Sequence, residues 1–175
     1  MQVPADVYYG IQTQRALENY PISGNRAHPS LIQAVGFIKK SAALTNGKLR
    51  LVQPRIADAI VRAAEDVISG KLNDQFVVDV YQAGAGVSFH MNANEVIANR
   101  AIELLGGNRG DYSLCHPNDC VNFGQSTNDV FPTSMRLATV KLLDELMESV
   151  HLLEISLSRK AKEFDRILKS GRTHM

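Results

Sequence analysis

Hydrophobic residues in the last third of the chain recur with a helical period. From about Asp129 to Lys169 they form two series that each repeat every eleven residues: Met135, Leu146, Leu157 and Leu168, and Leu142, Leu153 and Phe164. Eleven residues fit three turns of an α-helix, so the pattern predicts one nearly straight helix. Leu143, Met147 and Val150 make a second apolar stripe, which indicates packing partners on more than one side.

The predicted length of this helix decides its place in the fold. About forty residues give a helix of roughly 60 Å, whereas a compact domain of this chain length has a radius of gyration of roughly 16 Å. Such a helix reaches past its own domain, and its apolar stripes need other helices. We therefore expect the first helix of a larger bundle, in a polypeptide that continues beyond Met175.

Shorter helical patterns precede the long one. Helices are predicted over three stretches: 13–19, 30–45 and 54–69. Ser30 is the expected N-cap of the second, and Asn46 and Gly47 are its expected stop. Pro54 suits the first turn of the third, because its missing N–H would be unpaired there in any case.

One segment predicts a strand. Phe76–Tyr81 is rich in β-branched residues, and Gly84-Ala85-Gly86 follows it. The helix expected next has one apolar face, formed by Ile97, Ala101, Leu104 and Leu105. Strand, glycines and helix are the context of a dinucleotide-binding turn, but Phe89 stands where the third glycine belongs. The glycines therefore favour a tight turn that enters a helix.

Charge and cysteine content narrow the functional classes. The 175 residues include 19 Lys and Arg against 18 Asp and Glu, which argues against a nucleic-acid or membrane surface that depends on net charge. Cys115 and Cys120 fit a reducing cytoplasm better than a disulfide framework. No segment has the pattern of a signal peptide or membrane span, so we expect a cytoplasmic protein.

Small polar side chains gather just before the long helix, between His116 and Pro132. Ser126, Thr127 and Asn128 are good N-cap residues, and with the unpaired N–H groups of a helix start they offer several donors to an anion. The alternative is a capped loop that only begins a helix.

A metal site is not expected in the same stretch. Cys115, His116, Asp119 and Cys120 lie close in sequence, but their spacing fits no compact zinc pattern. We predict neither a metal nor a cofactor.

Four segments together carry a family resemblance. They are Val3-Pro-Ala-Asp-Val-Tyr-Tyr-Gly-Ile-Gln-Thr-Gln-Arg15, Gly84-Ala-Gly-Val-Ser-Phe-His-Met-Asn-Ala-Asn-Glu-Val96, His116-Pro-Asn-Asp-x-Val-Asn-x-x-Gln-Ser-Thr-Asn-Asp-x-x-Pro-Thr133 and Gly171-Arg-Thr-His174. In this order along the chain, they resemble signature segments of the aspartase/fumarase superfamily. The resemblance implies a mainly α-helical fold, with an N-terminal helical lyase domain over residues 1–127. Residues 128–175 would begin the central long-helix bundle that forms the core of a homotetramer.

The resemblance also implies an activity. Members of the superfamily remove an amine, water or another leaving group from a succinate-like substrate, through proton abstraction and an aci-carboxylate intermediate. Ala85 and Tyr8-Tyr9-Gly10 resemble the aspartases more than the fumarases, so we expect reversible elimination of ammonia from L-aspartate to give fumarate. A class II fumarase, which hydrates fumarate to malate, is the nearest alternative. A non-catalytic helical oligomerisation module is the more remote one.

Several residues take on expected roles by this resemblance. Ser126, Thr127 and Asn128 would bind the substrate, together with Val87 and Ser88 of the Gly-rich segment. The family usually has Thr at Val87 and Asn at His90, so one hydroxyl donor is lost and a histidine is gained.

Thr173 and His174 would support catalysis from a neighbouring subunit. The catalytic base of the family is a serine in a mobile Gly-Ser-Ser loop, and this chain contains no such motif. The chain is therefore expected to supply binding residues to a site that it does not complete.

His116, Asn118 and Asp119 match the segment that forms a second dicarboxylate site in fumarases. The alternative for His116 is a structural role in a turn that contains proline.

Overall fold

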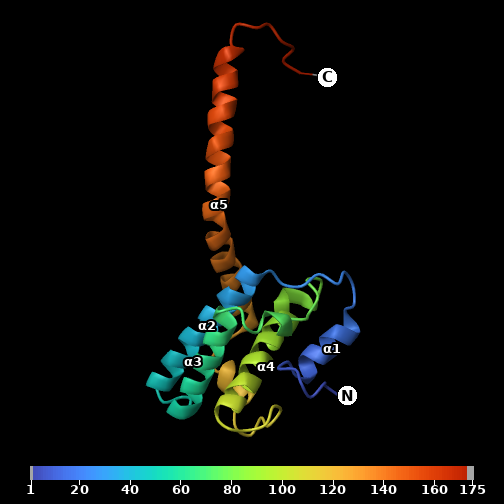
Figure 1. The fold of residues 1–175 in the computed structure, drawn as a ribbon, viewed down its shortest axis with the longest axis vertical. Coiled ribbons are helices and arrows are strands. Elements are labelled where there is room, and N and C mark those ends of the chain that lie inside the picture. The colour runs from blue at the N-terminus through green and yellow to red at the C-terminus, as the bar shows by residue number, and fades with distance from the viewer. Residues whose placement is uncertain (1, 173–175) are drawn as a thin grey trace. The chain divides into compact units, whose positions relative to one another are not determined.

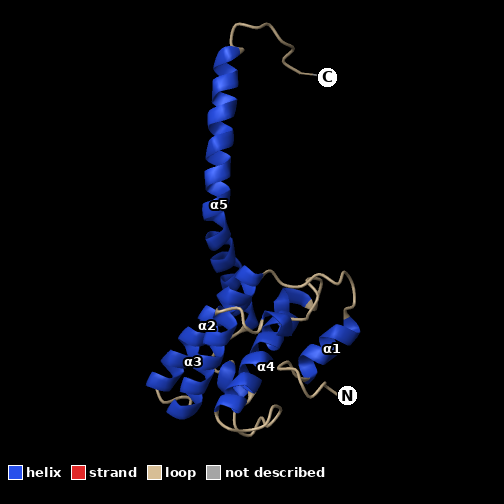
Figure 2. Ribbon diagram, in the orientation of Figure 1, coloured by secondary structure: helices blue, strands red, loops and turns tan. Residues whose placement is uncertain are grey.

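A computed structural model describes residues 2–172 and confirms a mainly α-helical chain (Figures 1 and 2). Within these residues five α-helices follow one another: α1 (Ile11–Asn19), α2 (Pro29–Lys48), α3 (Pro54–Ile68), α4 (Val87–Leu104) and α5 (Thr127–Glu163). Three short turns of helix lie between them: η1 (Asn73–Gln75), η2 (Gly84–Gly86) and the π-helical η3 (Pro117–Val121). The chain divides into two compact units, residues 1–138 and 139–175.

Small residues let α2 and α3 approach closely in the first unit. A Cβ at Gly36 would lie 2.9 Å from Ile68 Cγ1, and one at Gly47 would lie 2.9 Å from Ala57 Cβ. Buried alanines continue this contact along α3, in which Ile60, Ala63 and Ala64 are buried. Helix α3 packs in turn on α4, and α1 packs on the far side of α4 (Figure 1).

Helix α4 holds the N-terminal arm, residues 2–10, and the start of α1 through a buried carboxylate. Glu95 is 1% exposed and accepts hydrogen bonds from the backbone N–H groups of Gly10, Gln12 and Thr13, at 2.8 to 3.0 Å. The Thr13 hydroxyl donates to the same carboxylate at 2.7 Å. These are the unpaired donors of the first turn of α1, so one side chain of α4 caps that helix.

The strand predicted over Phe76–Tyr81 was wrong. Within the described residues this segment makes a single isolated bridge, between Arg26 and Asp79. Side chains satisfy its backbone instead, because Asn92 accepts from Val77 N and Asp79 accepts from the N–H groups of Ser23, Gly24 and Tyr81. The apolar residues Phe76 and Val78 are buried in a helical core. Burial, rather than pairing with a neighbouring strand, explains the β-branched composition.

The predicted boundaries of α2 needed small corrections. His28, rather than Ser30, is the N-cap, and its Nδ1 accepts from Ser30 N at 3.2 Å. The helix continues through Gly47 and ends at Lys48. Tight packing of Gly47 on Ala57 explains why this glycine is tolerated inside the helix.

Residues 139–172 of the second unit consist mainly of the later turns of α5. This helix ends at Glu163 and not at Lys169 as predicted, and Lys169 Nζ donates to the Phe164 carbonyl at 3.3 Å. The apolar side chains of both predicted stripes are exposed in this unit, including Leu146, Leu153 and Leu157. None of the described helices is long and apolar enough to cross a membrane.

Candidate active site

The polar run at the start of α5 forms the N-terminus of that helix. Ser126 Oγ accepts from Asn128 N at 3.2 Å, and the Ser126 carbonyl accepts from the N–H groups of Asp129 and Val130. Ser126 and Asn128 are exposed, whereas Thr127 is half-buried. The capping expected of this run is confirmed, and its exposed polar groups surround the positive end of a long helix.

A tight turn sets the start of α4 beside these residues. Ala85 and Gly86 both adopt the left-handed conformation, with φ of 53° and 80°. A Cβ at Gly86 would overlap the ring of Phe131 in α5, so this position requires glycine on steric as well as conformational grounds. The ring of Phe131 also packs edge-on against Phe89 of α4, with 5.9 Å between centroids. The Gly-x-Gly segment is the turn into a helix that the sequence favours.

A hydrogen bond joins the two helix starts. His90 Nδ1 lies 2.7 Å from Thr127 Oγ1, and His90 itself is 1% exposed. Val87 precedes His90 by one turn of α4, on the same face. Val87 is 44% exposed, whereas Ser88 is buried. The structure therefore brings the start of α5 together with the face of α4 that carries Val87 and His90, the two positions where this chain departs from the residues usual in the family.

Lys39 of α2 extends this contact into the core. The side chain is fully buried, and its Nζ lies 2.7 Å from His90 Nε2 and 2.9 Å from each of Asn122 Oδ1 and Gln125 Oε1. Both amides also donate to backbone carbonyls, Asn122 to Gln125 and Gln125 to Val121 and Phe123. Those bonds fix the amide orientations, so both side-chain oxygens face the ammonium group.

Burial sets the ionisation of this pair. Desolvation lowers the pKa of Lys39 to about 7. Desolvation, reinforced by the charge of Lys39, lowers the pKa of His90 to about 3. His90 is therefore a neutral imidazole near neutral pH. Lys39 is a buried cation with uncharged partners below its pKa of about 7, and loses its charge above it.

Sequence reasoning did not identify Lys39, although a signal exists. Lys39 lies four residues after Val35 and seven after Ile32, both buried in α2, so it falls on the apolar stripe of its helix. A lysine in that position calls for a specific set of partners, because an unpaired buried charge is costly.

His116 caps the turn that contains it. Its Nδ1 accepts from the N–H groups of Asn118 and Asp119, at 3.2 and 3.3 Å, while the side chains of both residues are exposed. Its ring also packs edge-on against Tyr112. This geometry fits the structural role considered for His116, and a second dicarboxylate site at His116, Asn118 and Asp119 stays a prediction.

Two other sequence predictions concern catalysis and metal binding. Thr173 and His174 lie outside the described residues, so their supporting roles also stay predictions. Within residues 2–172, no group of three or more His, Cys, Asp or Glu side chains is placed to hold a metal ion.

Comparison with known proteins agrees with this architecture. The family described as Lyase matches residues 1–175. An aspartate ammonia-lyase from Bacillus sp is 52% identical over 174 residues, and a class II fumarate hydratase from Halobacterium salinarum is 53% identical over 176. These alignments include 99% and 100% of this chain, but the chain spans only 37% of the length of each of these relatives.

Solved structures show the same fold. The fumarate lyase:delta crystallin from Brucella melitensis superimposes with a TM-score of 0.85 at 49% identity, covering 99% of this chain and 39% of that one. A class II fumarase from Schistosoma mansoni gives a TM-score of 0.80 at 38% identity, covering 100% and 37%. The matches run along the whole chain, as do the four signature segments, and the chain belongs to the aspartase/fumarase superfamily of lyases.

Proposed function

We propose that this chain provides the substrate-binding part of a lyase that eliminates ammonia from L-aspartate to give fumarate. One observation carries the proposal. The polar side chains of Ser126, Thr127 and Asn128 lie together at a helix N-terminus, and His90 Nδ1 lies 2.7 Å from Thr127 Oγ1. Neutral donors and a helix dipole suit a reaction that builds negative charge on a carboxylate, because they are fixed before the charge develops.

The proposed roles divide between this chain and groups outside it. Removal of a proton from the carbon next to a carboxylate converts that carboxylate to a dianion, which the hydroxyl and amide donors stabilise. The proton-abstracting base is assigned to a residue outside this chain. Thr173 and His174 are proposed to complete the carboxylate cradle from a neighbouring subunit, and His116, Asn118 and Asp119 are proposed as a second dicarboxylate site.

Aspartate is the preferred substrate because of Ala85, where fumarases typically have serine. A class II fumarase is the second candidate, supported by the 53% identity to the Halobacterium salinarum enzyme. The assay compares fumarate release by the full-length protein from L-aspartate and from L-malate. Faster release from aspartate is expected; faster release from malate would favour the fumarase, and release from neither would overturn both.

An Asn128→Ala variant separates a lyase from a helical oligomerisation module. Asn128 is exposed at the helix start, so its loss should leave folding unchanged and lower turnover. Unchanged turnover in the variant, with assembly also unchanged, would remove Asn128 from the proposed substrate site.

We further propose a cytoplasmic homotetramer built on α5. Support comes from the apolar side chains of residues 139–172, such as Leu146, Leu153 and Leu157, which are more than half exposed. Burial of each leucine between chains would stabilise association by about 1.5–3 kcal/mol. Analytical ultracentrifugation of the 175-residue chain should therefore detect self-association without turnover; a monodisperse monomer would argue against the assembly.

A further inference from the structure

The network around Lys39 has an unusual charge balance. Three acceptors meet the three N–H bonds of the ammonium group, so its hydrogen-bonding capacity is matched. None of the three partners carries a negative charge, since they are an imidazole and two amides. A fully buried cation without a carboxylate partner is rare in protein cores. The missing negative charge is therefore a property that needs an explanation.

The network fixes the tautomer of His90. While Lys39 is charged, its ammonium group only donates, so His90 Nε2 accepts from Lys39 and the single proton of the neutral imidazole lies on Nδ1. That N–H donates to Thr127 Oγ1 at 2.7 Å. With a lone pair of its oxygen engaged by His90, Thr127 keeps its own hydroxyl hydrogen to donate elsewhere. Thr127 is only half-buried, so this hydrogen is open to a ligand at the start of α5.

We propose that Lys39 is a positioning residue of the substrate site: acting through His90, it holds the Thr127 hydroxyl as a donor to a bound carboxylate, and that carboxylate balances its buried charge. The inference rests on the proposed function, because it assumes that the anion at this helix start is the dicarboxylate substrate. It adds a residue of α2 to a site otherwise formed by α4 and α5.

The side chains that contact Lys39 include no carboxylate, so a bound anion is the counter-charge that we infer for it. His90 on α4 is its titratable contact, and the segment between η3 and α5 presents the amides of Asn122 and Gln125. The neighbouring Lys40 instead pairs with Glu65 of α3, at 2.8 Å and with both side chains partly exposed. Two adjacent lysines of one helix thus differ in partner, burial and proposed role, which makes Lys40 a matched control.

The test combines a spectroscopic and a binding measurement on the full-length protein. At about pH 6, where Lys39 is mostly charged, ¹⁵N NMR of labelled histidine should show His90 as the Nδ1–H tautomer, and Lys39→Met should shift it toward Nε2–H. Calorimetry with succinate, a non-reacting dicarboxylate, should show at least about tenfold weaker binding in Lys39→Met and unchanged binding in Lys40→Met. In turnover, Lys39→Met should raise KM for the substrate more than it lowers kcat.

Two results would overturn the inference: an Nε2–H tautomer in the unmodified protein at about pH 6, or succinate binding to a folded Lys39→Met variant as tight as to the parent. The tautomer measurement needs no variant, so it decides the matter even if Lys39→Met does not fold. Neither measurement depends on turnover. Absence of lyase activity would therefore defeat the proposed function separately, while a failed tautomer prediction would defeat only the role of Lys39.

Discussion

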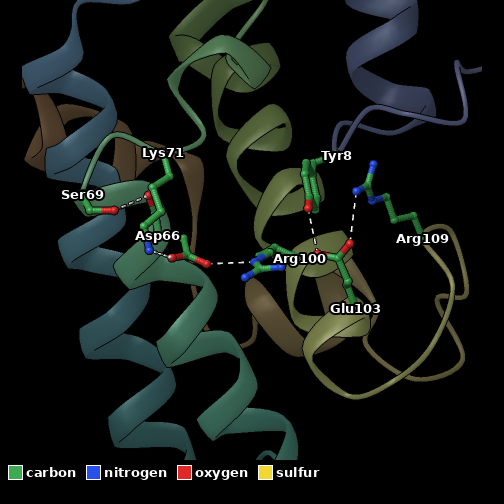
Figure 3. A network of polar contacts seen from close by, with 7 residues as sticks. All are labelled: Tyr8, Asp66, Ser69, Lys71, Arg100, Glu103 and Arg109. Carbon is green, nitrogen blue, oxygen red and sulfur yellow. Dashed lines mark hydrogen bonds and ion pairs between the residues drawn. The ribbon is translucent and has the colours of Figure 1, made fainter.

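Two polar networks in the first unit surround their central cations, Arg100 and Lys39, with opposite kinds of partner. Around Arg100, three cations meet two carboxylates: Arg100 Nε donates to Asp66 at 2.8 Å, Arg100 also contacts Glu103, and Lys71 and Arg109 complete the pairs (Figure 3). Tyr8 donates to Glu103 at 2.8 Å within the same group. Around Lys39, by contrast, every partner is uncharged.

The ionisation of the two networks follows this difference. Partial burial acts to raise the pKa of the Asp66 carboxyl, but hydrogen bonds from Lys71 and Arg100 outweigh it and lower that pKa. For Lys39, burial acts unopposed and lowers its pKa to about 7. The Arg100 network is complete as it stands and links α3, α4 and the N-terminal arm. In the Lys39 network each N–H bond of the ammonium group has an acceptor, but no partner balances its positive charge. A positive charge without a partner is what a site for an anion requires.

The largest expected effect separates the two networks by removing one hydroxyl from each. Thr127→Val should lower kcat/KM for the substrate about 100- to 1,000-fold, since it deletes a donor to the developing dianion. Tyr8→Phe removes the hydroxyl bonded to Glu103 and should instead lower the free energy of unfolding by about 1 kcal/mol with kcat/KM unchanged. Steady-state kinetics and urea denaturation of both variants test the pair. A kinetic loss in Tyr8→Phe as large as in Thr127→Val would erase the distinction.

Arg100→Met should have the next largest effect, and on stability. It leaves Asp66 and Glu103 without their shared cation, so the free energy of unfolding should fall by about 1–3 kcal/mol. Lys39→Met introduces an apolar side chain of similar length where a buried charge stood, and should be less destabilising. Denaturation of both variants at neutral pH checks the order; a larger loss in Lys39→Met would mean that the Lys39 network mainly stabilises the fold.

A smaller effect depends on pH. The unfolded lysine has its ordinary pKa of about 10.4, and the folded value is about 7, so the unfolded chain binds more protons between these values. The free energy of unfolding should therefore rise with pH across this window, by up to about 1.4 kcal/mol per pH unit. Lys39→Met should lack that rise, so the difference between the two proteins isolates Lys39 from other titrating groups. A difference that stays constant from about pH 7 to 9 would contradict the lowered pKa.

Val87→Thr should have the smallest effect. It restores the hydroxyl that the family usually has, one turn before His90, and should improve use of the dicarboxylate or leave it unchanged if the Nδ1–H of His90 already compensates through Thr127. Because Val87 is 44% exposed, the gain should stay below about 1 kcal/mol in kcat/KM. A large loss of activity in this variant would refute the interpretation of Val87 as a missing donor.

Local sequence patterns predicted the helices of this fold better than they predicted the contacts between distant segments. Pro54 and the helical pattern over residues 54–69 were sufficient to predict α3, because helix starts and apolar periods depend on neighbouring residues. The strand predicted over Phe76–Tyr81 was wrong, because the backbone of this segment donates to the Asn92 side chain. The sequence pattern does not indicate that contact. The end of α5 was also missed, because apolar periodicity continues past Glu163 into residues that are exposed.

The candidate site shows the same limit. Family resemblance located Ser126, Thr127 and Asn128, and the replacement at His90 was visible in the sequence. Lys39 lies 51 residues from His90 and 86 from Gln125, so only the packing of α2 near α4 and the segment before α5 reveals these contacts. Long-range polar contacts of this kind leave no periodic pattern, whereas a helix does.

Proton uptake on ligand binding tests the central claim most directly. If a dicarboxylate balances the charge of Lys39, its binding at about pH 8 should draw a proton onto a lysine that is mostly neutral in the free protein. Calorimetric titration with succinate in buffers of different ionisation enthalpy should therefore give net proton uptake by the unmodified protein and by Lys40→Met, and none by Lys39→Met. Binding without proton uptake, or uptake that persists in Lys39→Met, would contradict the account.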